Sequence, residues 1–398
     1  ILGDNIESIE TPRSNLLIIN FKKPSSSIEG LLTSIYLTPL SPTFYENHSD
    51  DYLNNDFVGT GEYILKSFSN ELQILEPNPN YWGEEVKNEG INFVGYSNSS
   101  SLYGAFRSNQ VDVLLSNSID DSQRNMLKIL SENGSIKEGS SIPNEISFIT
   151  LRTNQEPFNN KKIRLALALS LNRLLISDKV SYGLRDPILS LLPPIFKTDN
   201  LNTWPEYDPL KAREILKGEG YCDGNKLIVP LYYRSNVDTD KLIALTWQQQ
   251  VNDSISDCIL INIYGVESTT IYKNLSEGLY PAVILDWIGE YSDPIAYLSP
   301  LVSCKDYVGE ICLEGESVFS GSFWASKEVE SLFTKSEMLQ GEERIENLLR
   351  IDKLTSIAVP YIPIWISSQK AWAQANISTP TFNNAGLILM SELEKTEN

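Results

Sequence analysis

The segment DWIGEYSDP at residues 286–294 gathers side chains that could do chemistry, directly after the apolar run AVIL. Asp286, Glu290 and Asp293 supply three carboxylates within this one segment. A pair of carboxylates can act as the acid and the base of a glycoside hydrolase. A carboxylate in a closed site can also hold a ligand's ammonium group through a charge-assisted hydrogen bond. Both interpretations remain open on the residues alone.

Two aromatic residues of the same segment could shape a pocket. Trp287 offers a flat apolar face for ligand side chains, although packing between lobes explains it equally well. Tyr291 could close the pocket, but an aromatic residue beside a turn is as often part of a core. Asp293 precedes Pro294, a context that favours a turn or helix-cap role over a ligand contact. We keep all of them as candidate ligand-binding residues together with Glu290.

The residues that other enzyme classes need are scarce. His48 is the single histidine and stands in a connector-like NHSD stretch, so a nucleophile triad lacks its base. The sequence contains no GxSxG, HExxH or P-loop motif, and Gly59 and Gly61 are not followed by GK[ST]. We therefore predict no catalytic residue, no metal and no cofactor, with a carboxylate-dependent hydrolase as the alternative.

Four cysteines fall in two matched settings. Cys304 and Cys312 flank a short polar loop, and Cys222 and Cys258 each stand just before an apolar, strand-like run. This pattern predicts two disulfides, Cys304–Cys312 and Cys222–Cys258, and with them an oxidising compartment. Four reduced thiols are the alternative, and zinc is the weakest interpretation because no CxxC occurs.

The length and net charge of the chain limit the classes of protein to which it can belong. At 398 residues the chain is long for one hydrophobic core, so we expect at least two lobes. The 32 Lys and Arg against 52 Asp and Glu give a net charge of −20, which repels phosphate backbones and excludes nucleic acid as an expected partner. The longest candidate for a membrane span, Ile163–Ile176, is interrupted by Arg164, Asn172 and Arg173.

The first part of the chain predicts several strands and one clear helix. Pro39–Asn55 is rich in Pro, Ser and Asn and predicts a connector. A helix is expected at 99–107. Because strands flank this helix, we expect a βαβ unit with a parallel strand pair. The strands are predicted at 15–21, 57–68, 71–77, 91–96 and 111–115.

The second part alternates strands and helices, which indicates a further α/β lobe. One buried helix is expected in PFNNKKIRLALALSLNRLLISDKV at 157–180, beginning after Asn159 or Asn160. Its residues Lys161, Lys162 and Arg164 predict a solvated basic patch. Asp208 caps a second helix that Gly218 or Gly220 ends. Other strands are predicted at 146–153, 227–233, 259–264, 282–286 and 359–367, and other helices at 239–252, 268–276, 326–339 and 342–357.

Several blocks along the chain resemble one family, the peptide- and nickel-type solute-binding proteins of ABC importers. Each block is weak alone, and their shared order carries the resemblance. The blocks are VGTGEYIL at 58–65, NPNYWG at 78–83, FRSNQVDVL at 106–114, NQEPFNNKKIRLALALSLNR at 154–173, YDPLKAREILKGEGY at 207–221, DWIGEYSDP at 286–294 and YIPIWISSQKAWAQANI at 361–377.

The resemblance implies an α/β, two-lobed periplasmic-binding-protein fold with mixed sheets in each lobe and the ligand between the lobes. Residues 1–55 would be the remnant of a small extra domain. Lobe one would span 56–150, lobe two 151–366, and 367–398 would return to lobe one, with hinges near 150–155 and 365–370. Family members carry a further segment ahead of this point, so the sequence would be either a fragment or a shortened member. In both cases any ligand contacts from that segment are missing.

The resemblance also assigns roles to the candidate site. Glu290 stands where peptide-binding relatives have an Asp that pairs with the ligand's α-ammonium, and it is one methylene longer. Trp287 matches a tryptophan that lines the side-chain pocket. The implied protein is a monomer that binds a peptide or other small solute and delivers it to the membrane permease of an ABC importer. A scaffold or sensor without a transport role is a further alternative.

The implied location is extracytoplasmic, either periplasmic or at the cell surface. The sequence opens at Ile1 without a basic region or an apolar region typical of an export signal. A signal or a lipid anchor would therefore belong to a segment upstream of Ile1.

Overall fold

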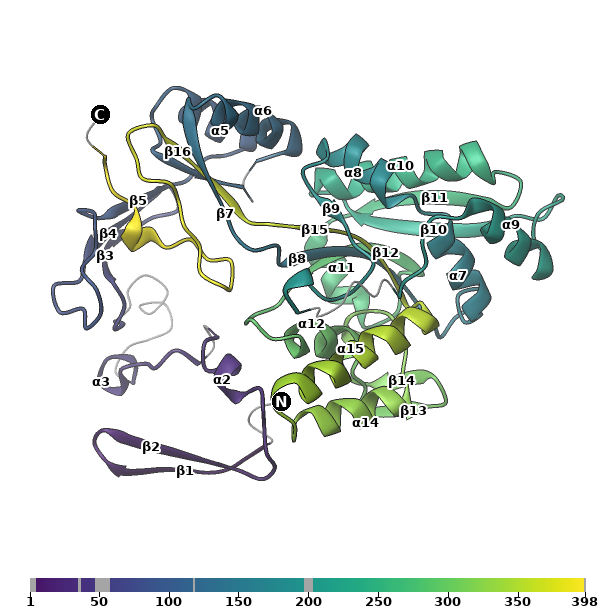
Figure 1. The fold of residues 1–398 in the computed structure, drawn as a ribbon, viewed down its shortest axis with the longest axis horizontal. Helices are drawn as coiled ribbons and strands as arrows, with labels where there is room; N and C mark the ends of the chain where they lie inside the picture. The colour runs from purple at the N-terminus through teal and green to yellow at the C-terminus, as the bar shows by residue number, and fades with distance from the viewer. Residues whose placement is uncertain (1–4, 35–36, 47–57, 117–118, 197–202, 397–398) are drawn as a thin grey trace.

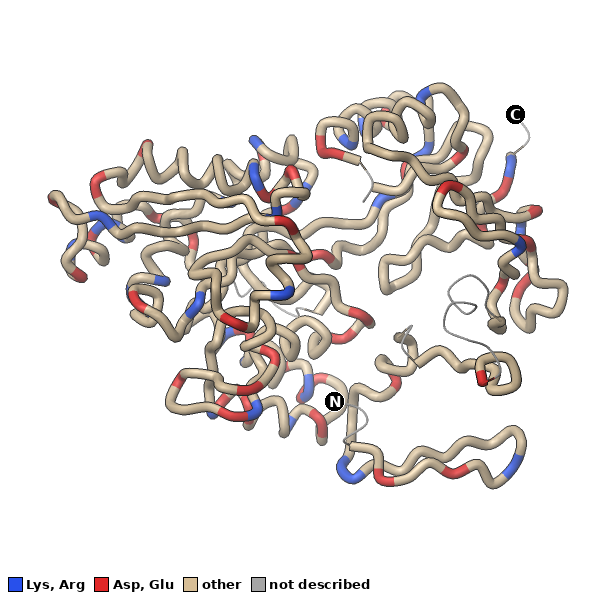
Figure 2. The backbone as a smooth tube through the Cα atoms, turned by 180° about the vertical axis from the view of Figure 1, so that it is seen from behind, with Lys and Arg blue, Asp and Glu red and all other residues tan. Residues whose placement is uncertain are grey.

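A computed structural model describes residues 5–34, 37–46, 58–116, 119–196 and 203–396. Figure 1 shows three parts: an N-terminal segment, lobe one around β3–β7 and β16, and lobe two around β8–β15. Within the described residues no helix is long and apolar enough to cross a membrane. Acidic and basic residues are scattered over all three parts of the chain (Figure 2).

Lobe two is built on a six-stranded sheet with the order β11-β10-β12-β8-β15-β9. β10 pairs in parallel with β11 and β12, whereas β8 pairs antiparallel with β12 and β15. The sheet is therefore mixed, as predicted. Its strands are β8 (Glu145–Leu151), β9 (Asp186–Pro187), β10 (Leu227–Arg234), β11 (Ile259–Val266), β12 (Ala282–Ile288) and β15 (Tyr361–Ser367).

Helices cover both faces of this sheet because its strands are apolar on both sides. Ile149 and Leu151 of β8 belong to one core, and the alternating Ile146 and Phe148 belong to the other. The first core packs on α7 (Lys161–Leu169), α8 (Arg173–Ser181), α9 (Pro209–Gly218) and α10 (Asp238–Ser254). The second packs on α11 (Ser268–Leu275), α12 (Ile295–Val302), α14 (Lys327–Ser336) and α15 (Gly341–Ala358).

The helix predicted after Asn160 is in fact two helices. Asn160 caps α7 by accepting a hydrogen bond from the Lys162 amide at 2.9 Å, as expected. The prediction of one continuous helix is wrong because Asn172 caps a new helix, α8, by accepting from the Leu175 amide at 3.1 Å. Asp208 caps α9 through the Lys211 amide at 2.9 Å, which confirms that helix start.

Lys161, Lys162 and Arg164 were predicted to form a solvated basic patch at the start of α7, and this prediction is wrong for Arg164. Arg164 is only 2% exposed, and burial lowers the pKa of its guanidinium to about 10. It donates to the carbonyl oxygens of Phe158 at 2.7 Å and Ala358 at 2.6 Å. Arg164 therefore joins α7 to the end of α15 inside lobe two. Its buried guanidinium is hydrogen-bonded to backbone carbonyl groups in place of water.

Lobe one contains two three-stranded sheets, both antiparallel. β3 (Tyr63–Phe68), β4 (Leu72–Pro77) and β5 (Ile91–Val94) form one, and β6 (Val113–Leu115), β16 (Lys370–Gln374) and β7 (Ile136–Ser140) form the other. The helix between β5 and β6 is α5 (Ser99–Arg107), as predicted. The predicted parallel pair is wrong, because β6 pairs with β16 from the distant end of the chain and not with β5. Mixed pairing is thus found in lobe two and not among the described strands of lobe one.

Within the described residues, the chain crosses between lobe one and lobe two at 141–144 and at 368–369. β8 already belongs to the sheet of lobe two, so the first crossing precedes it and does not lie at 150–155 as predicted. The second crossing follows β15, within the predicted 365–370. The crossings are bonded to each other, since the Ser141 amide donates to the Gln369 carbonyl at 2.8 Å and the Gln369 amide donates to Ser141 Oγ at 2.9 Å.

The N-terminal segment, residues 5–34, runs beside lobe two. It contains the hairpin of β1 (Ile6–Arg13) and β2 (Leu16–Phe21) and the short helix α2 (Ile28–Leu31). The strand predicted at 15–21 is β2. Further along, the predicted connector includes the short helix α3 (Pro42–Tyr45), while its remainder, with His48, lies outside the described residues.

Candidate ligand-binding site

The site loop, residues 289–294, leaves the carboxyl end of β12 in the middle of the large sheet. Loops at this end of a strand are where open α/β sheets place ligands. Gly289 is needed here because a Cβ at this position would lie 2.5 Å from the Tyr297 ring. The Tyr297 hydroxyl donates to the Asn144 carbonyl at 2.9 Å, so the loop is held against the crossing between the lobes.

Glu290, Trp287 and Tyr291 all line one cavity of about 880 Å³. Glu290 is exposed to it. Trp287 is partly buried, and its indole Nε1 donates to the Ala296 carbonyl at 2.8 Å, so it both packs on the second core and forms the cavity wall. Tyr291 is 8% exposed, and burial raises the pKa of its hydroxyl to about 12. The structure therefore brings three of the four predicted residues together.

The Asp293 carboxylate is hydrogen-bonded to other groups of the protein. Its carboxylate receives two hydrogen bonds from Arg344, at 2.8 and 3.0 Å, and a third from the Ile295 amide at the start of α12. Asp293 is not among the residues that line the cavity. The turn and cap role favoured by its sequence context explains these contacts, and the ligand-contact role has no support in them.

The other walls of the cavity come from elements that the sequence did not connect to the site. One wall is the N-terminal segment, and among the described residues the lining includes none from lobe one. The lining is mostly apolar, and it also includes two lysines and three glutamates. The lining residues are Asn5, Lys22, Lys23, Pro24, Ser25, Ser27, Leu31, Trp287, Glu290, Tyr291, Ile295, Ala296, Ser299, Pro300, Ser303, Glu316, Phe333, Thr334, Glu337 and Met338.

A buried charge cluster fixes the strands that lead to the site loop. Arg234 at the end of β10 donates to Asp240 at 2.7 and 3.0 Å, to Asp286 at 2.9 and 2.7 Å, and to the Tyr272 hydroxyl at 3.0 Å. Burial alone would lower the pKa of Arg234, but its hydrogen bonds to the two carboxylates raise it. All five guanidinium N–H groups are thereby used, so Arg234 positions β12 and has no donor left for a solute.

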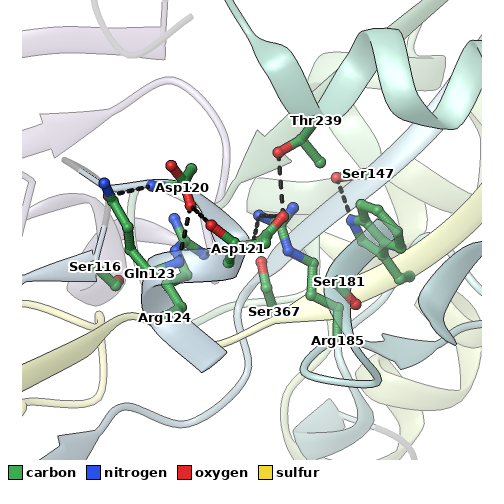
Figure 3. Close-up of polar contacts among 12 residues, drawn as sticks. Ser116, Asp120, Asp121, Gln123, Arg124, Ser147, Ser181, Arg185, Thr239 and Ser367 are labelled. Carbon is green, nitrogen blue, oxygen red and sulfur yellow. Dashed lines mark hydrogen bonds and ion pairs between the residues drawn. The ribbon is translucent and has the colours of Figure 1, made fainter. Parts of the chain in front are cut away.

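The lobes meet through a second cluster, shown in Figure 3. Asp121, the first residue of α6 (Asp121–Glu132) in lobe one, accepts from Arg185 of lobe two at 3.0 and 3.2 Å and from the Thr239 hydroxyl at 3.2 Å. The Arg185 guanidinium also lies over the Trp365 ring, 4.9 Å from its centroid. Trp365 in turn donates to Ser147 Oγ at 2.9 Å. The contact between the lobes is therefore connected to two strands of lobe two. Trp365 belongs to β15, which precedes the second crossing, and Ser147 belongs to β8, which follows the first crossing.

Both predicted disulfides are present. Cys222–Cys258 joins residues 36 apart in sequence and Cys304–Cys312 joins residues 8 apart. Cys222, Cys258 and Asp257 cluster closely enough to suggest a metal site, but the two sulfur atoms are bonded to each other. A disulfide cannot supply the thiolates that a metal would need.

The sequence pattern of the bacterial extracellular solute-binding proteins, family 5 Middle, matches residues 2–309. The chain belongs to this family, which confirms the resemblance. Membership of an extracellular family also supports the predicted extracytoplasmic location.

Individual relatives are similar at low identity. The nickel-binding periplasmic protein of Escherichia coli K12 is 26% identical over 278 residues, which cover 66% of this chain and 52% of the relative. The dipeptide-binding protein of Pseudomonas aeruginosa PAO1 is 25% identical over 300 residues, which cover 74% of this chain and 55% of the relative. The chain thus spans about half the length of the curated relatives it matches.

Solved structures share the fold. NikA from Brucella suis in complex with Fe(III)-EDTA superposes with a TM-score of 0.84 at 18% identity, covering 99% of this chain and 80% of that chain. The dipeptide binding protein from Pseudoalteromonas sp. SM9913 in complex with Met-Leu gives a TM-score of 0.80 at 21% identity, covering 99% of this chain and 76% of that chain. The predicted two-lobed fold is confirmed.

Proposed function

We propose that this protein binds a peptide or peptide-like solute and delivers it to the membrane permease of an ABC importer. The observation that carries the proposal is the cavity of about 880 Å³ around Glu290, Trp287 and Tyr291. A cavity of this size with mostly apolar walls and a few polar groups suits a small ligand. Similar proteins that bind dipeptides favour the same class of solute.

Glu290 supplies the specific contact for an ammonium group. It is the exposed carboxylate at the tip of the site loop, and Trp287 and Tyr291 lie on the same cavity. A carboxylate that loses water when the site is filled binds an ammonium group more strongly than a neutral acceptor does. Because Glu is one methylene longer than Asp, we expect the solute's amine to sit farther from β12 than an Asp would place it.

We further propose that the protein catalyses nothing. A glycosidase needs two carboxyl groups free to act on the substrate. Asp286 is hydrogen-bonded to Arg234 and Asp293 to Arg344, so Glu290 is left without a nearby uncommitted partner in the same segment. A scaffold or sensor that kept the fold and lost its ligand would not bind a solute, so ligand binding distinguishes it from a transport protein.

The setting follows from the same proposal. We propose that the protein works as a monomer in the periplasm or at the cell surface, with a lipid anchor in a segment upstream of Ile1 as one means of attachment. We also propose that residues 1–55 are the remnant of a small extra domain. With a net charge of −20, nucleic acid is not a partner.

The test is binding of short peptides with free or blocked amines. Alanine–phenylalanine peptides of two to five residues, each with a free or an acetylated amine, would be titrated by calorimetry and by thermal unfolding. We expect free-amine peptides to bind and to raise the melting temperature. Glu290→Gln should weaken them about tenfold or more without lowering the melting temperature of the unliganded protein.

The matched control is Glu277→Gln, an exposed glutamate of lobe two that does not line the cavity. It should leave the affinity unchanged. Mass spectrometry of solute carried through gentle purification would identify the natural ligand. If no peptide in the set binds and no peptide is carried through, the proposed function is wrong; if peptides bind wild type and Glu290→Gln equally, the role of Glu290 alone is wrong.

A further inference from the structure

A second, much smaller pocket lies at the contact between the two lobes. Its volume is about 20 Å³, which is room for one water-sized group and not for an organic solute. It shares no lining residue with the ligand cavity. Both lobes contribute charged side chains to its lining, namely Arg124, Lys128, Glu138 and Lys370 from lobe one and Arg185 from lobe two.

Positive charge exceeds negative charge in this junction pocket. Among the described residues that line it, four are basic and one, Glu138, is acidic. Glu138 is already engaged, because it pairs with the Lys370 ammonium and accepts a hydrogen bond from the Trp372 indole at 2.7 Å. Lys128 lies 3.9 Å from Glu132 in an exposed pair. The two arginines therefore decide the charge in the buried part of the pocket.

Arg124 and Arg185 share one carboxylate. Arg185 donates to Asp121 at 3.0 and 3.2 Å, and Arg124 Nη1 lies 3.6 Å from the same carboxylate (Figure 3). Two mostly buried guanidinium groups thus face one negative charge. Burial lowers the pKa of Arg124, and the positive charge of Arg185 lowers it further, against the attraction of the nearby carboxylates. Two of these carboxylates, Asp120 and Glu145, do not line the pocket.

Two buried donors of the same arginines lack an acceptor. The Nε–H groups of Arg124 and Arg185 are buried and have no hydrogen-bond partner among the described residues. A buried donor without an acceptor destabilises a folded chain, and in proteins such a group commonly marks a bound water molecule or ion. A water molecule would supply only hydrogen bonds. An anion would supply hydrogen bonds and the missing negative charge together.

We propose that the junction pocket binds one small monovalent anion, such as chloride, between Arg124 of lobe one and Arg185 of lobe two. The volume suits a monatomic ion and leaves no room for a solute. Because the anion contacts both lobes, it stabilises the conformation in which Asp121 and Arg185 are joined. The site is separate from the ligand cavity, so this inference does not depend on which solute the cavity takes.

The first experiment compares thermal unfolding in sodium chloride and in sodium gluconate at one fixed ionic strength, without peptide. Screening is then equal, and gluconate is too large for the pocket. The melting temperature in chloride minus that in gluconate should be about 2 °C or more higher for wild type than for Arg124→Gln. Arg107→Gln, an exposed arginine of α5 in the same lobe and outside the pocket, is the matched control and should match wild type.

The second experiment locates the ion in wild type and does not depend on how well the variant folds. Crystals grown in sodium bromide should show an anomalous bromide peak between Arg124 and Arg185. Without a peak there, the pocket holds water and the proposal is wrong. With a peak but the same chloride–gluconate difference in wild type and Arg124→Gln, the bromide is an adventitious ion only, and the proposal is again wrong. Peptide binding is measured separately, so neither outcome bears on the proposed function.

Discussion

Asp121 and Arg185 join the two lobes through a buried ion pair, with the Asp121 carboxylate 3.0 and 3.2 Å from one guanidinium nitrogen of Arg185. Asp121 belongs to lobe one and is 7% exposed. Arg185 belongs to lobe two and lies over the Trp365 ring of β15. Any movement that separates the lobes at this point must break the pair. The two lobes are therefore joined here by a contact that lies outside the ligand cavity.

Replacing Asp121 should loosen the contact between the two lobes. Asp121→Asn removes the charge of the carboxylate that Arg185 and Thr239 contact, and it leaves the Arg185 guanidinium without its counter-charge. The conformation in which the lobes are joined here should become less populated, so that the radius of gyration rises. Peptide affinity should stay unchanged, because none of the described residues that line the cavity belongs to lobe one. Small-angle X-ray scattering gives the radius of gyration and calorimetry gives the affinity. Asp253→Asn, on the exposed face of α10, is the control; an unchanged radius of gyration in Asp121→Asn would show that the pair does not hold the lobes together.

Arg344 should act as a positioning residue for the site. Arg344→Gln removes a buried ion pair to Asp293 of the site loop and the bond to Ser26 of the N-terminal segment, which should lower the free energy of unfolding by about 3 kcal/mol. Affinity for peptides with a free or an acetylated amine should fall by one common factor, because both of these cavity walls move. Denaturant unfolding and calorimetry measure the two effects. Arg344→Lys should not restore binding because an ammonium group cannot form the two-pronged contact.

Arg350→Gln is the matched control for Arg344, since Arg350 lies on the same helix in an exposed pair with Glu328. An exposed pair contributes little to stability. Adding Asp293→Asn to Arg344→Gln should recover part of the lost stability because the unpaired carboxylate is removed. Equal losses in the single and the double variant would contradict the ion-pair explanation.

The sequence predicted the elements whose signals are local. The helix at 99–107 and the cap at Asp208 appear where expected, because apolar periodicity and capping chemistry depend on neighbouring residues. The start of α8 was missed although Asn172 offered a cap signal, because a continuous apolar pattern hid the break. The pairing of β6 with β16 could not be read from the sequence, since the two strands are more than two hundred positions apart.

At the site, too, the sequence predicted the local features and missed the contacts between distant parts of the chain. Trp287, Glu290 and Tyr291 were found because they share one segment after an apolar strand. Lys23 and Leu31 were missed because their place in the cavity lining depends on where the N-terminal segment packs, and no local pattern encodes that contact. The pairing of Asp293 with Arg344 likewise joins distant parts of the sequence, although the Asp-Pro context already indicated a structural role for Asp293.

The two disulfides should contribute unequally to stability. Closing a longer loop removes more entropy from the unfolded chain, and separations of 36 and 8 residues correspond to about 3.8 and about 2.5 kcal/mol. Cys222→Ala with Cys258→Ala should therefore lower the free energy of unfolding more than Cys304→Ala with Cys312→Ala. Denaturant unfolding of the two double variants measures the difference. A larger loss from the Cys304–Cys312 pair would contradict the loop-length explanation.

Glu330 should make stability depend on pH. Burial raises the pKa of this carboxyl to about 7 from its usual 4.5, although the Cys304 amide donates to it at 2.8 Å. Below pH 4.5 the group is protonated in both the folded and the unfolded chain. Between pH 4.5 and 7 only the unfolded chain releases the proton, so the free energy of unfolding falls as pH rises. Above pH 7 this loss in the free energy of unfolding stays at its full size.

Glu330→Gln keeps an acceptor for the Cys304 amide and removes the titrating group. The variant should gain stability relative to wild type at pH 8, by about 1 kcal/mol or less because the carboxyl is partly exposed and water screens it. At pH 4.5 that gain should largely disappear. Denaturant unfolding at the two pH values measures it, with the exposed Glu328→Gln on the same helix as control. A gain of the same size at both pH values would mean that packing, and not ionisation of Glu330, separates the variant from wild type.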